Sequence, residues 1–233
     1  GKYRQVLSEQ YGVSEHYFYE IVSRGNSIAF QIADELCQNN KIDFSNLGDI
    51  EVVVYGGGTK NRTKAMKVPK EIDEDLAYLV GVLISDGHIS KGSIDFSVFE
   101  EGVRASVKER LLKIFGRFDS YYGGTRIYLC NVFAPFFFNK IFGVPFGKKS
   151  GIVEIPEVIL KSDNKVISSF IKGVFDGDGT VSSGLSYRTY SKKLAEGLTY
   201  LLARLGIYSY LRSGDGNGYR LNIPSPYYRQ FME

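Results

Sequence analysis

Two aspartates stand at matching places in the chain and are the residues best suited to chemistry. Asp86 lies in the segment "LVGVLISDG" (79–87), and Asp178 lies in the segment "IKGVFDGDG" (171–179). Two carboxylates brought together without partners repel one another, and one of them is driven toward protonation. Divalent cations relieve this repulsion, and Mg²⁺ typically takes one or two carboxylates together with water and phosphate oxygens. The pair therefore predicts metal-assisted phosphodiester hydrolysis, provided that the fold brings the two side chains together.

The stretch "DGDG" (176–179) taken alone is typical of an ordinary turn or of part of a calcium-binding loop. A calcium loop needs further Asp or Asn ligands and a downstream glutamate, whereas the chain continues with Thr180, Val181 and Ser182. Its counterpart "ISDG" (84–87) follows a second apolar segment, which favours a repeated functional element. Asp176 is matched by Ile84 in that counterpart, so we interpret Asp176 as secondary to Asp178.

Each aspartate follows a segment whose apolar residues recur at helical spacing, within 72–83 and 166–175. Gly81 and Gly173 occupy the same place in the two helices, where glycine costs about 1 kcal/mol relative to alanine. A close approach of two backbones is a physical reason to keep glycine there. We therefore expect the helices to cross at these glycines, which would make Asp86 and Asp178 neighbours.

The similarity of the two halves continues beyond the motifs. Each copy goes on with an alternating strand, a helical run, two strand-like pieces and an aromatic patch. In the first copy the strand and the helix are 93–99 and 104–116, and in the second they are 185–191 and 192–206. This order predicts an α+β fold of two pseudo-symmetric subdomains, 71–161 and 162–233.

The residues before the repeat differ in character. Residues 1–54 read as a small helical domain, in which Gly12 and Gly25 act as stops and Ser14 and Asn26 as caps. This pattern resembles a helix-turn-helix, and a small helical bundle would have the same pattern. It leaves open whether these helices contact DNA.

Residues 55–70 combine three consecutive glycines with a run of basic residues and no acidic one. Glycine confers flexibility, and the charges oppose burial. The segment is interpreted as a solvated linker or, alternatively, as a basic strap that follows phosphates.

The two motifs and the elements that follow them resemble the LAGLIDADG homing endonucleases with two motifs in one chain. The resemblance covers roughly residues 71–233. It implies two αββαββ subdomains packed through the motif helices, with saddle-shaped antiparallel sheets that lie in the major groove of a long, asymmetric double-stranded DNA target. It also implies a monomer that cleaves both strands with Mg²⁺ and leaves short 3′ overhangs, with Mn²⁺ able to substitute and Ca²⁺ binding without cleavage.

The resemblance assigns roles to particular residues. Asp86 and Asp178 would bind the metals, with Ile84, Gly87 and Gly179 beside them. The turn "GVPFGKKSG" (143–151) resembles a lysine-bearing turn of the family, so Lys148 or Lys149 would stabilise developing charge or help to activate water. An ordinary solvated lysine is the alternative. The second copy ends at Glu233 before an equivalent lysine, so we expect either unlike basic partners for the two DNA strands or a truncated second subdomain.

Polar and apolar residues alternate along the predicted strands. Arg, Asn, Ser and Tyr on one sheet face suit base edges and phosphates, and the alternative is the solvated face of an antiparallel sheet. The candidate DNA-binding residues are Lys60, Arg62, Lys64, Lys67, Ser93, Ser97, Arg104, Arg126, Tyr128, Ser186, Arg188, Lys192, Arg212, Arg220 and Asn222.

Composition is compatible with these expectations. The 233 residues are 43% hydrophobic and carry a formal net charge of +3, which permits a nucleic-acid partner without requiring one. The two cysteines form no framework, no signal peptide opens the chain, and no apolar run is long enough to span a membrane. We therefore expect an intracellular protein, in the cytoplasm or nucleoid of a prokaryote or in an organelle.

Two other functions share the expected fold. An RNA-splicing maturase or a DNA-binding regulator would tolerate loss of a motif aspartate, and both aspartates are present. The endonuclease portion of an intein is a further alternative, although the chain shows no nucleophilic Cys or Ser at its start and no His-Asn at its end.

Overall fold

The computed structural model describes residues 2–17, 38, 50–53, 65–120, 125–131, 133–181, 184–213, 216 and 218–232. The chain divides into two compact units, Gly1–Val53 and Val54–Glu233. In the first unit, helix α1 (Lys2–Tyr11) is followed by Gly12, which has a φ of 63°. The Ser14 hydroxyl then accepts a hydrogen bond from the backbone N–H of Tyr17 at 3.2 Å. The predicted stop at Gly12 and cap at Ser14 are therefore confirmed.

The rest of the expected helical domain, including Gly25 and Asn26, lies almost entirely outside the described residues. The first unit ends with the short strand β1 (Glu51–Val52), and the second unit begins its described part near β2 (Met66–Lys67). Most of the predicted linker also lies outside the described residues, and with it Lys60, Arg62 and Lys64.

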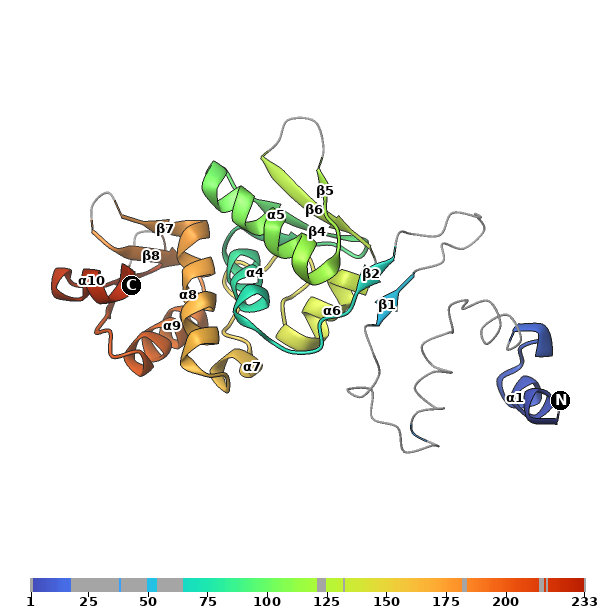
Figure 1. The fold of residues 1–233 in the computed structure, drawn as a ribbon. Helices are drawn as coiled ribbons and strands as arrows, with labels where there is room; N and C mark the ends of the chain where they lie inside the picture. Colours follow the sequence, from blue (N-terminus) through green and yellow to red (C-terminus); the bar gives the residue numbers. More distant parts are fainter. Residues whose placement is uncertain are drawn as a thin grey trace. The chain divides into compact units, whose positions relative to one another are not determined.

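The second unit contains two runs of elements in the same order (Figure 1). The first run is α4 (Glu74–Asp86), β3 (Gly87–Ile89), β4 (Ser93–Ser97), α5 (Glu101–Phe115), β5 (Asp119–Ser120), β6 (Arg126–Cys130) and α6 (Phe133–Phe142). The second run, after the single turn α7 (Glu157–Leu160), is α8 (Asn164–Asp178), β7 (Gly179–Thr180), β8 (Ser186–Thr189), α9 (Lys192–Arg204), β9 (Tyr210–Ser213) and β10 (Tyr219–Asn222). A 3₁₀ turn, η3 (Ser225–Tyr227), and α10 (Tyr228–Met232) follow. The expected α+β fold of two αββαββ subdomains is confirmed.

The two subdomains have sheets of matching topology. Among the described residues, the strand orders are β3-β4-β6-β5 and β7-β8-β10-β9, with antiparallel pairing throughout. The match extends to single residues, because Gly87 lies opposite Phe96 and Gly179 lies opposite Tyr187. In both subdomains the first strand follows its motif helix without a loop, so each motif aspartate lies at a junction between a helix and a sheet.

Helices α4 and α8 pack side by side at the centre of the second unit (Figure 1). Both begin with an aspartate cap, since Asp73 accepts from Leu76 N at 2.8 Å and Asp163 accepts from Val166 N at 3.0 Å. A Cβ added at Gly81 would overlap the carbonyl oxygen of Phe170. A Cβ added at Gly173 would overlap the Tyr78 carbonyl in the same way. The expected crossing at the two glycines is therefore confirmed.

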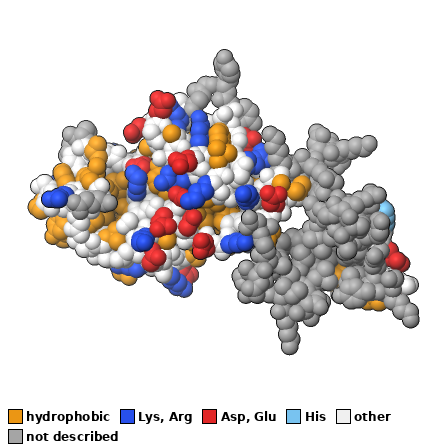
Figure 2. Space-filling model, viewed as in Figure 1, with side chains coloured by type: hydrophobic (Ala, Val, Ile, Leu, Met, Phe, Trp, Pro, Cys, Tyr) orange, Lys and Arg blue, Asp and Glu red, His pale blue; other side chains and the backbone are white. Residues whose placement is uncertain are grey.

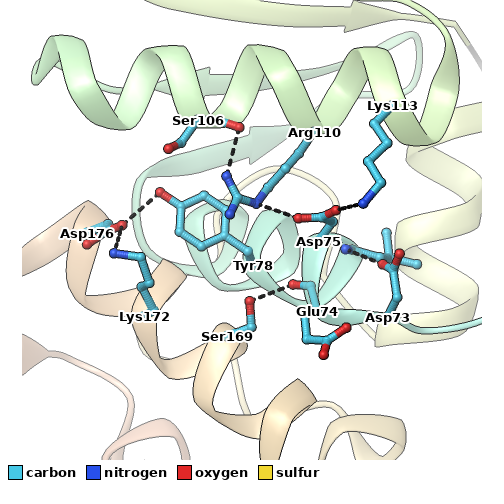
Figure 3. A network of polar contacts seen from close by, with 11 residues as sticks. Asp73, Glu74, Asp75, Tyr78, Ser106, Arg110, Lys113, Ser169, Lys172 and Asp176 are labelled. Atoms are coloured by element: carbon cyan, nitrogen blue, oxygen red, sulfur yellow. Dashed lines mark hydrogen bonds and ion pairs between the residues drawn. The ribbon is translucent and has the colours of Figure 1, made fainter. Parts of the chain in front are cut away.

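A polar network joins this helix pair to α5 (Figure 3). The hydroxyl of the fully buried Tyr78 donates to Asp176 Oδ2 at 2.8 Å, and Lys172 lies 3.3 Å from the same oxygen. The Arg110 guanidinium stacks over the Tyr78 ring at 4.2 Å and reaches Asp75 Oδ1 at 3.0 Å. Asp176 therefore contacts the neighbouring motif helix, as a structural residue would.

Candidate metal and nucleic-acid site

Asp86 and Asp178 are the last residues of α4 and α8. Since the helices cross at their glycines and run on together, the two carboxyl groups become neighbours. Burial raises the pKa of Asp86 to about 6, with further contributions from the charge of Asp178 and a hydrogen bond to it, while Lys149 acts in the opposite direction. Asp86 is half-buried and Asp178 is exposed, so the pair opens to solvent on the Asp178 side.

Lys149 reaches the end of α4 from the turn that follows α6. Its ammonium donates hydrogen bonds to the carbonyl oxygens of Ile84 and Ser85, the latter at 2.6 Å. Carbonyl groups in the last turn of a helix lack partners within the helix, so a cation is favoured there. Burial lowers the pKa of Lys149 to about 8, and the carboxylates of Asp178 and Asp86 oppose that shift. Lys149 is thus a cation close to both motif aspartates.

The turn that carries Lys149 is held from both subdomains. The Gly147 N–H donates to the carbonyl of Ile89 at 2.8 Å, at the end of β3. On the other side, the buried Ser191 hydroxyl caps α9 by accepting from Leu194 N at 3.2 Å and also donates to the carbonyl of Val153. These contacts place Lys149 by packing, while Lys148 beside it is exposed.

A pocket of about 750 Å³ opens around the two aspartates. One wall is the end of α4 and the lysine turn, and the opposite wall is strand β8 with the start of α9. Asp86, Asp178, Lys148 and Lys149 all line it, as does Tyr187, which the sequence did not single out. The pocket therefore combines two acids, two lysines and a phenol.

The exposed face of the second sheet carries a row of arginines. In the strand register, Arg220 of β10 lies directly opposite Arg188 of β8 on one side and Arg212 of β9 on the other. Like charges directly opposite one another destabilise a sheet. A row of three suits the binding of a polyanion that neutralises them. Asn222 lies opposite Ser186 two residues along, so these predicted residues share a strand pair.

The outer face of the first sheet is balanced by acidic residues. Asp95 of β4 lies opposite Tyr128, and it accepts from the Ser97 hydroxyl at 2.9 Å. Arg126 is 3.6 Å from the same carboxylate. The predicted residues Ser97, Arg126 and Tyr128 are therefore gathered around Asp95, and the positive charge of Arg126 is partly compensated within the sheet.

Comparison with solved structures shows the same fold in homing endonuclease I-DmoI. A structure described as I-DmoI in complex with DNA and Mn matches with a TM-score of 0.53 and 19% identity, over 70% of this chain and 96% of that one. A structure of I-DmoI in complex with DNA and Ca matches with a TM-score of 0.53 and 18% identity, over 69% of this chain and 87% of that one. The family model described as a LAGLIDADG-like domain matches residues 165–232.

The chain has the two-motif LAGLIDADG fold. The resemblance drawn from the two motifs is thereby confirmed.

Curated relatives contain a LAGLIDADG-like segment within much longer proteins. Elongation factor 2 of Methanopyrus kandleri is 30% identical over 213 residues, which are 88% of this chain and 16% of that protein. DNA-directed RNA polymerase subunit Rpo1C of Methanocaldococcus jannaschii is 27% identical over 216 residues, which are 88% and 23%. The replication factor C small subunit of the same organism is 34% identical over 150 residues, which are 61% and 8%. The chain thus spans less than a quarter of each.

The donors at the ends of the LAGLIDADG helices fit a divalent cation that keeps open positions. No group of three or more His, Cys, Asp or Glu side chains able to hold a metal occurs in the part of the chain that the structure describes. Two carboxylates with the remaining positions left to water and phosphate are the set that Mg²⁺ commonly uses. Asp86 and Asp178 are accordingly the residues that would hold it.

The backbone groups expected beside the metal have partners of their own. The Gly87 and Gly179 N–H groups close α4 and α8 by donating to Leu83 and Phe175 carbonyls. The carbonyl of Ile84 accepts from Lys149. In this state Ile84 therefore binds the lysine, and its carbonyl would have to be shared or released to reach a cation.

Four predicted DNA-binding residues lie away from the strand faces or at their margin. Arg104 on α5 donates to the carbonyl of Val98 at 3.3 Å and to that of Phe99. Lys192 in the first turn of α9 lies 3.5 Å from Glu196. Lys67 is exposed on β2, and the Ser93 hydroxyl makes its contact with Ser90 at 3.0 Å.

Figure 2 shows Lys and Arg side chains interspersed with Asp and Glu over the helical face that carries α5. Mixed charge of this kind contrasts with the arginine row on the second sheet. None of the helices in the described ranges is long and apolar enough to cross a membrane.

Proposed function

We propose that the LAGLIDADG unit is a site-specific endonuclease that hydrolyses both strands of a long, asymmetric DNA target and leaves short 3′ overhangs. The observation that carries this proposal is the meeting of Asp86 and Asp178 at the ends of crossed helices, beside Lys149. Metal-assisted hydrolysis of phosphodiesters needs this combination of oxygen ligands and a nearby cation. The protein would act as a monomer, because one chain supplies both motifs.

The destabilised state of the carboxylate pair supports a divalent cofactor. Asp178 and burial both favour the neutral form of Asp86, as the direction of its pKa shift indicates. A bound Mg²⁺ would remove this repulsion, activate water and stabilise the leaving oxygen. Mn²⁺ would substitute for it, and Ca²⁺ would support binding without cleavage. The printed descriptions of the I-DmoI structures name Mn, Mg and Ca for that protein.

The remaining parts of the site supply binding and charge stabilisation. The arginine row of Arg188, Arg220 and Arg212 would neutralise phosphates, while Asn222 and Ser186 beside it offer hydrogen bonds to base edges. Lys149, fixed against the end of α4, would stabilise the charge that develops on the scissile phosphate. Its neighbour Lys148 is exposed and would contact the DNA backbone.

Cleavage of plasmids tests the function. Wild type, Asp86→Asn and Asp178→Asn proteins would be incubated with Mg²⁺ and plasmids that carry candidate insertion sites, with EDTA as the blank. We expect the wild type to linearise a target plasmid and each variant to lose about a hundredfold or more in rate. Both variants should still bind the target in Ca²⁺. Full double-strand cleavage by either variant would contradict the assignment, and target binding without any cleavage by the wild type would indicate a regulator or maturase instead.

We further propose that the chain belongs to an in-frame insert, as the endonuclease portion of an intein. An elongation factor, a component of RNA polymerase and a replication factor have no activity in common, and the matched segment is 16%, 23% and 8% of each. A segment shared by such proteins is more simply an insert than a part of their machinery. Mass spectrometry of mature elongation factor 2 from Methanopyrus kandleri should find the flanking peptides joined and the matched segment missing. A mature factor that retains the segment would overturn this.

A further inference from the structure

The two halves of the site differ at one matched position. Gly87 lies opposite Phe96 in the first sheet, and Gly179 lies opposite Tyr187 in the second. Both side chains point into the core, since Phe96 is 0% exposed and Tyr187 is 2% exposed. The shape of the ring is thus kept in both subdomains, and a hydroxyl is added in one of them.

The added hydroxyl lies at the proposed catalytic pocket. Tyr187 lines this pocket together with Asp86, Asp178 and Lys149, and its ring packs against Phe175 with the centroids 5.7 Å apart. Burial raises the pKa of Tyr187, and the charges of Asp178 and Asp86 raise it further. The phenol therefore stays protonated beside two carboxylates and keeps a proton to donate.

This proton has no acceptor among the residues that the structure describes. Over those ranges, no hydrogen bond from the Tyr187 hydroxyl is found, although a buried hydroxyl normally has a partner. The other tyrosine at the motif helices, Tyr78, donates to Asp176 at 2.8 Å. An unpaired donor on a nearly buried residue at a pocket wall indicates that the acceptor comes from outside.

We propose that the Tyr187 hydroxyl donates a hydrogen bond to an oxygen held between Asp86 and Asp178. The acceptor is either a phosphate oxygen of the DNA or a water molecule on the divalent cation, so the inference rests on the proposed nuclease function. Phe96 cannot make this bond in the first subdomain. The two halves of the site therefore treat the two DNA strands unequally, and one strand depends on Tyr187.

The variant Tyr187→Phe tests the proposal with little risk to the fold, because phenylalanine already fills the matched place in the first sheet. Rates would be measured in Mg²⁺ on target DNA labelled on one strand or the other. Mn²⁺ affinity of the DNA-free protein would be measured by electron paramagnetic resonance. We expect cleavage of one strand to slow about tenfold, the scale of one hydrogen bond to a charged group, and the other strand to change less than about twofold. The melting temperature should stay that of the wild type.

The two acceptors give different results. If the acceptor is cation-bound water, Mn²⁺ affinity falls together with the rate, and if it is a phosphate oxygen, Mn²⁺ affinity is unchanged. Tyr190→Phe is the matched control, since Tyr190 lines the same pocket but is 55% exposed, and it should leave both strands unaffected.

Other results separate this proposal from the proposed function. Unchanged Mn²⁺ affinity with both strands cut at wild-type rates, or with both slowed equally, would overturn the role of Tyr187 and leave the nuclease standing. A wild type that does not cleave would refute the nuclease. In that case a loss of Mn²⁺ affinity in Tyr187→Phe supports the hydroxyl as a partner of the cation, and unchanged affinity refutes it.

Discussion

At the end of α4, a half-buried carboxyl group lies between a second carboxyl group and a buried lysine. Asp86 is more easily protonated than a free aspartate, and Lys149 is more easily deprotonated than a free lysine. Burial is the first cause in both cases, and the opposite charges compensate for it only in part. Residues kept in so unfavourable a state are commonly found at functional sites.

Replacing Asp86 should stabilise the metal-free protein at high pH. The pKa of Asp86 is raised from 3.8 to about 6 on folding, so the charge destabilises the folded state progressively as the pH rises from about 4 to about 6, and fully above that. With screening, we expect Asp86→Asn to gain about 1–2 kcal/mol at pH 8 and nothing below about pH 4. Urea unfolding in EDTA at the two pH values measures this. Glu196→Gln, on the exposed face of α9, should show no gain, and an Asp86→Asn protein that is less stable than wild type at pH 8 would contradict the repulsion.

Lys149 and Lys148 can be told apart by substitution. Lys149→Met keeps the length of the side chain and loses the bonds to the Ile84 and Ser85 carbonyls. We expect the cleavage rate to fall about a hundredfold while DNA affinity in Ca²⁺ changes only a few-fold. Lys148→Met, the matched control from the exposed neighbour, should affect affinity more than rate. The reverse pattern would assign the catalytic role to Lys148.

At the scale of the elements, the close approach of α4 and α8 determines where the carboxylates lie. Neither helix can shift outward without losing the packing at Gly81 and Gly173, and the network around Tyr78 holds the pair against α5. The site is therefore built on rigid elements rather than on loops.

A methyl group at the crossing should disturb both stability and activity. In Gly81→Ala the new Cβ meets backbone atoms of α8, which cannot rotate away as a side chain would. We expect a loss of about 1–3 kcal/mol in the free energy of unfolding, together with reduced cleavage. Gly92→Ala is the control, because nothing lies within 4 Å of its added Cβ. Equal stability of the two variants would show that the helices separate easily.

The two aspartates of "FDGDG" (175–179) should have separable roles. Asp176→Asn weakens the bond from Tyr78 and the ion pair with Lys172, so we expect a loss of about 1–3 kcal/mol in stability with cleavage retained at permissive temperature. Asp178→Asn should abolish cleavage without that loss. A double-mutant cycle of Asp176→Asn with Tyr78→Phe, followed by thermal unfolding, should show coupling between the two sites. Independent effects would contradict the contact.

At the scale of the whole LAGLIDADG unit, the two sheets share a topology and differ in charge. The second has three arginines in register, whereas the first pairs Arg126 with Asp95. The formal net charge of +3 conceals this difference. A DNA-binding surface built this way would draw more of its electrostatic attraction from the second subdomain.

The salt dependence of DNA binding should reveal this asymmetry. If Arg220 contacts a phosphate, Arg220→Gln should reduce the slope of log K against log salt concentration by about 0.9. Arg126→Gln should reduce it less, because Asp95 already compensates that charge. Titrations of the target in Ca²⁺ over a range of salt concentrations measure both slopes. Lys165→Gln, at the far end of α8 from Asp178, should leave the slope unchanged, and a larger effect at Arg126 than at Arg220 would refute the charge argument.

Much of the fold could be predicted from local patterns in the sequence. The apolar spacing before Asp86 and Asp178, the strand alternation and the glycines at matched places indicated two αββαββ subdomains and a helix crossing. Each of these signals depends on residues a few positions apart, where periodicity reflects local geometry directly. The same reasoning assigned Asp176 a secondary place, and its contact with Tyr78 is consistent with that.

Tertiary structure alone decided how distant residues combine. Only packing between the subdomains brings Lys149 to the carbonyls of α4 and leaves Lys148 in solvent, because both lysines stand in the same turn of the sequence. Only strand register aligns Arg220 with its two neighbours and sets Tyr187 where the first sheet has Phe96. The repeated motif determined which residues would do chemistry, and the long-range contacts of helices and strands decided which partners each of them has.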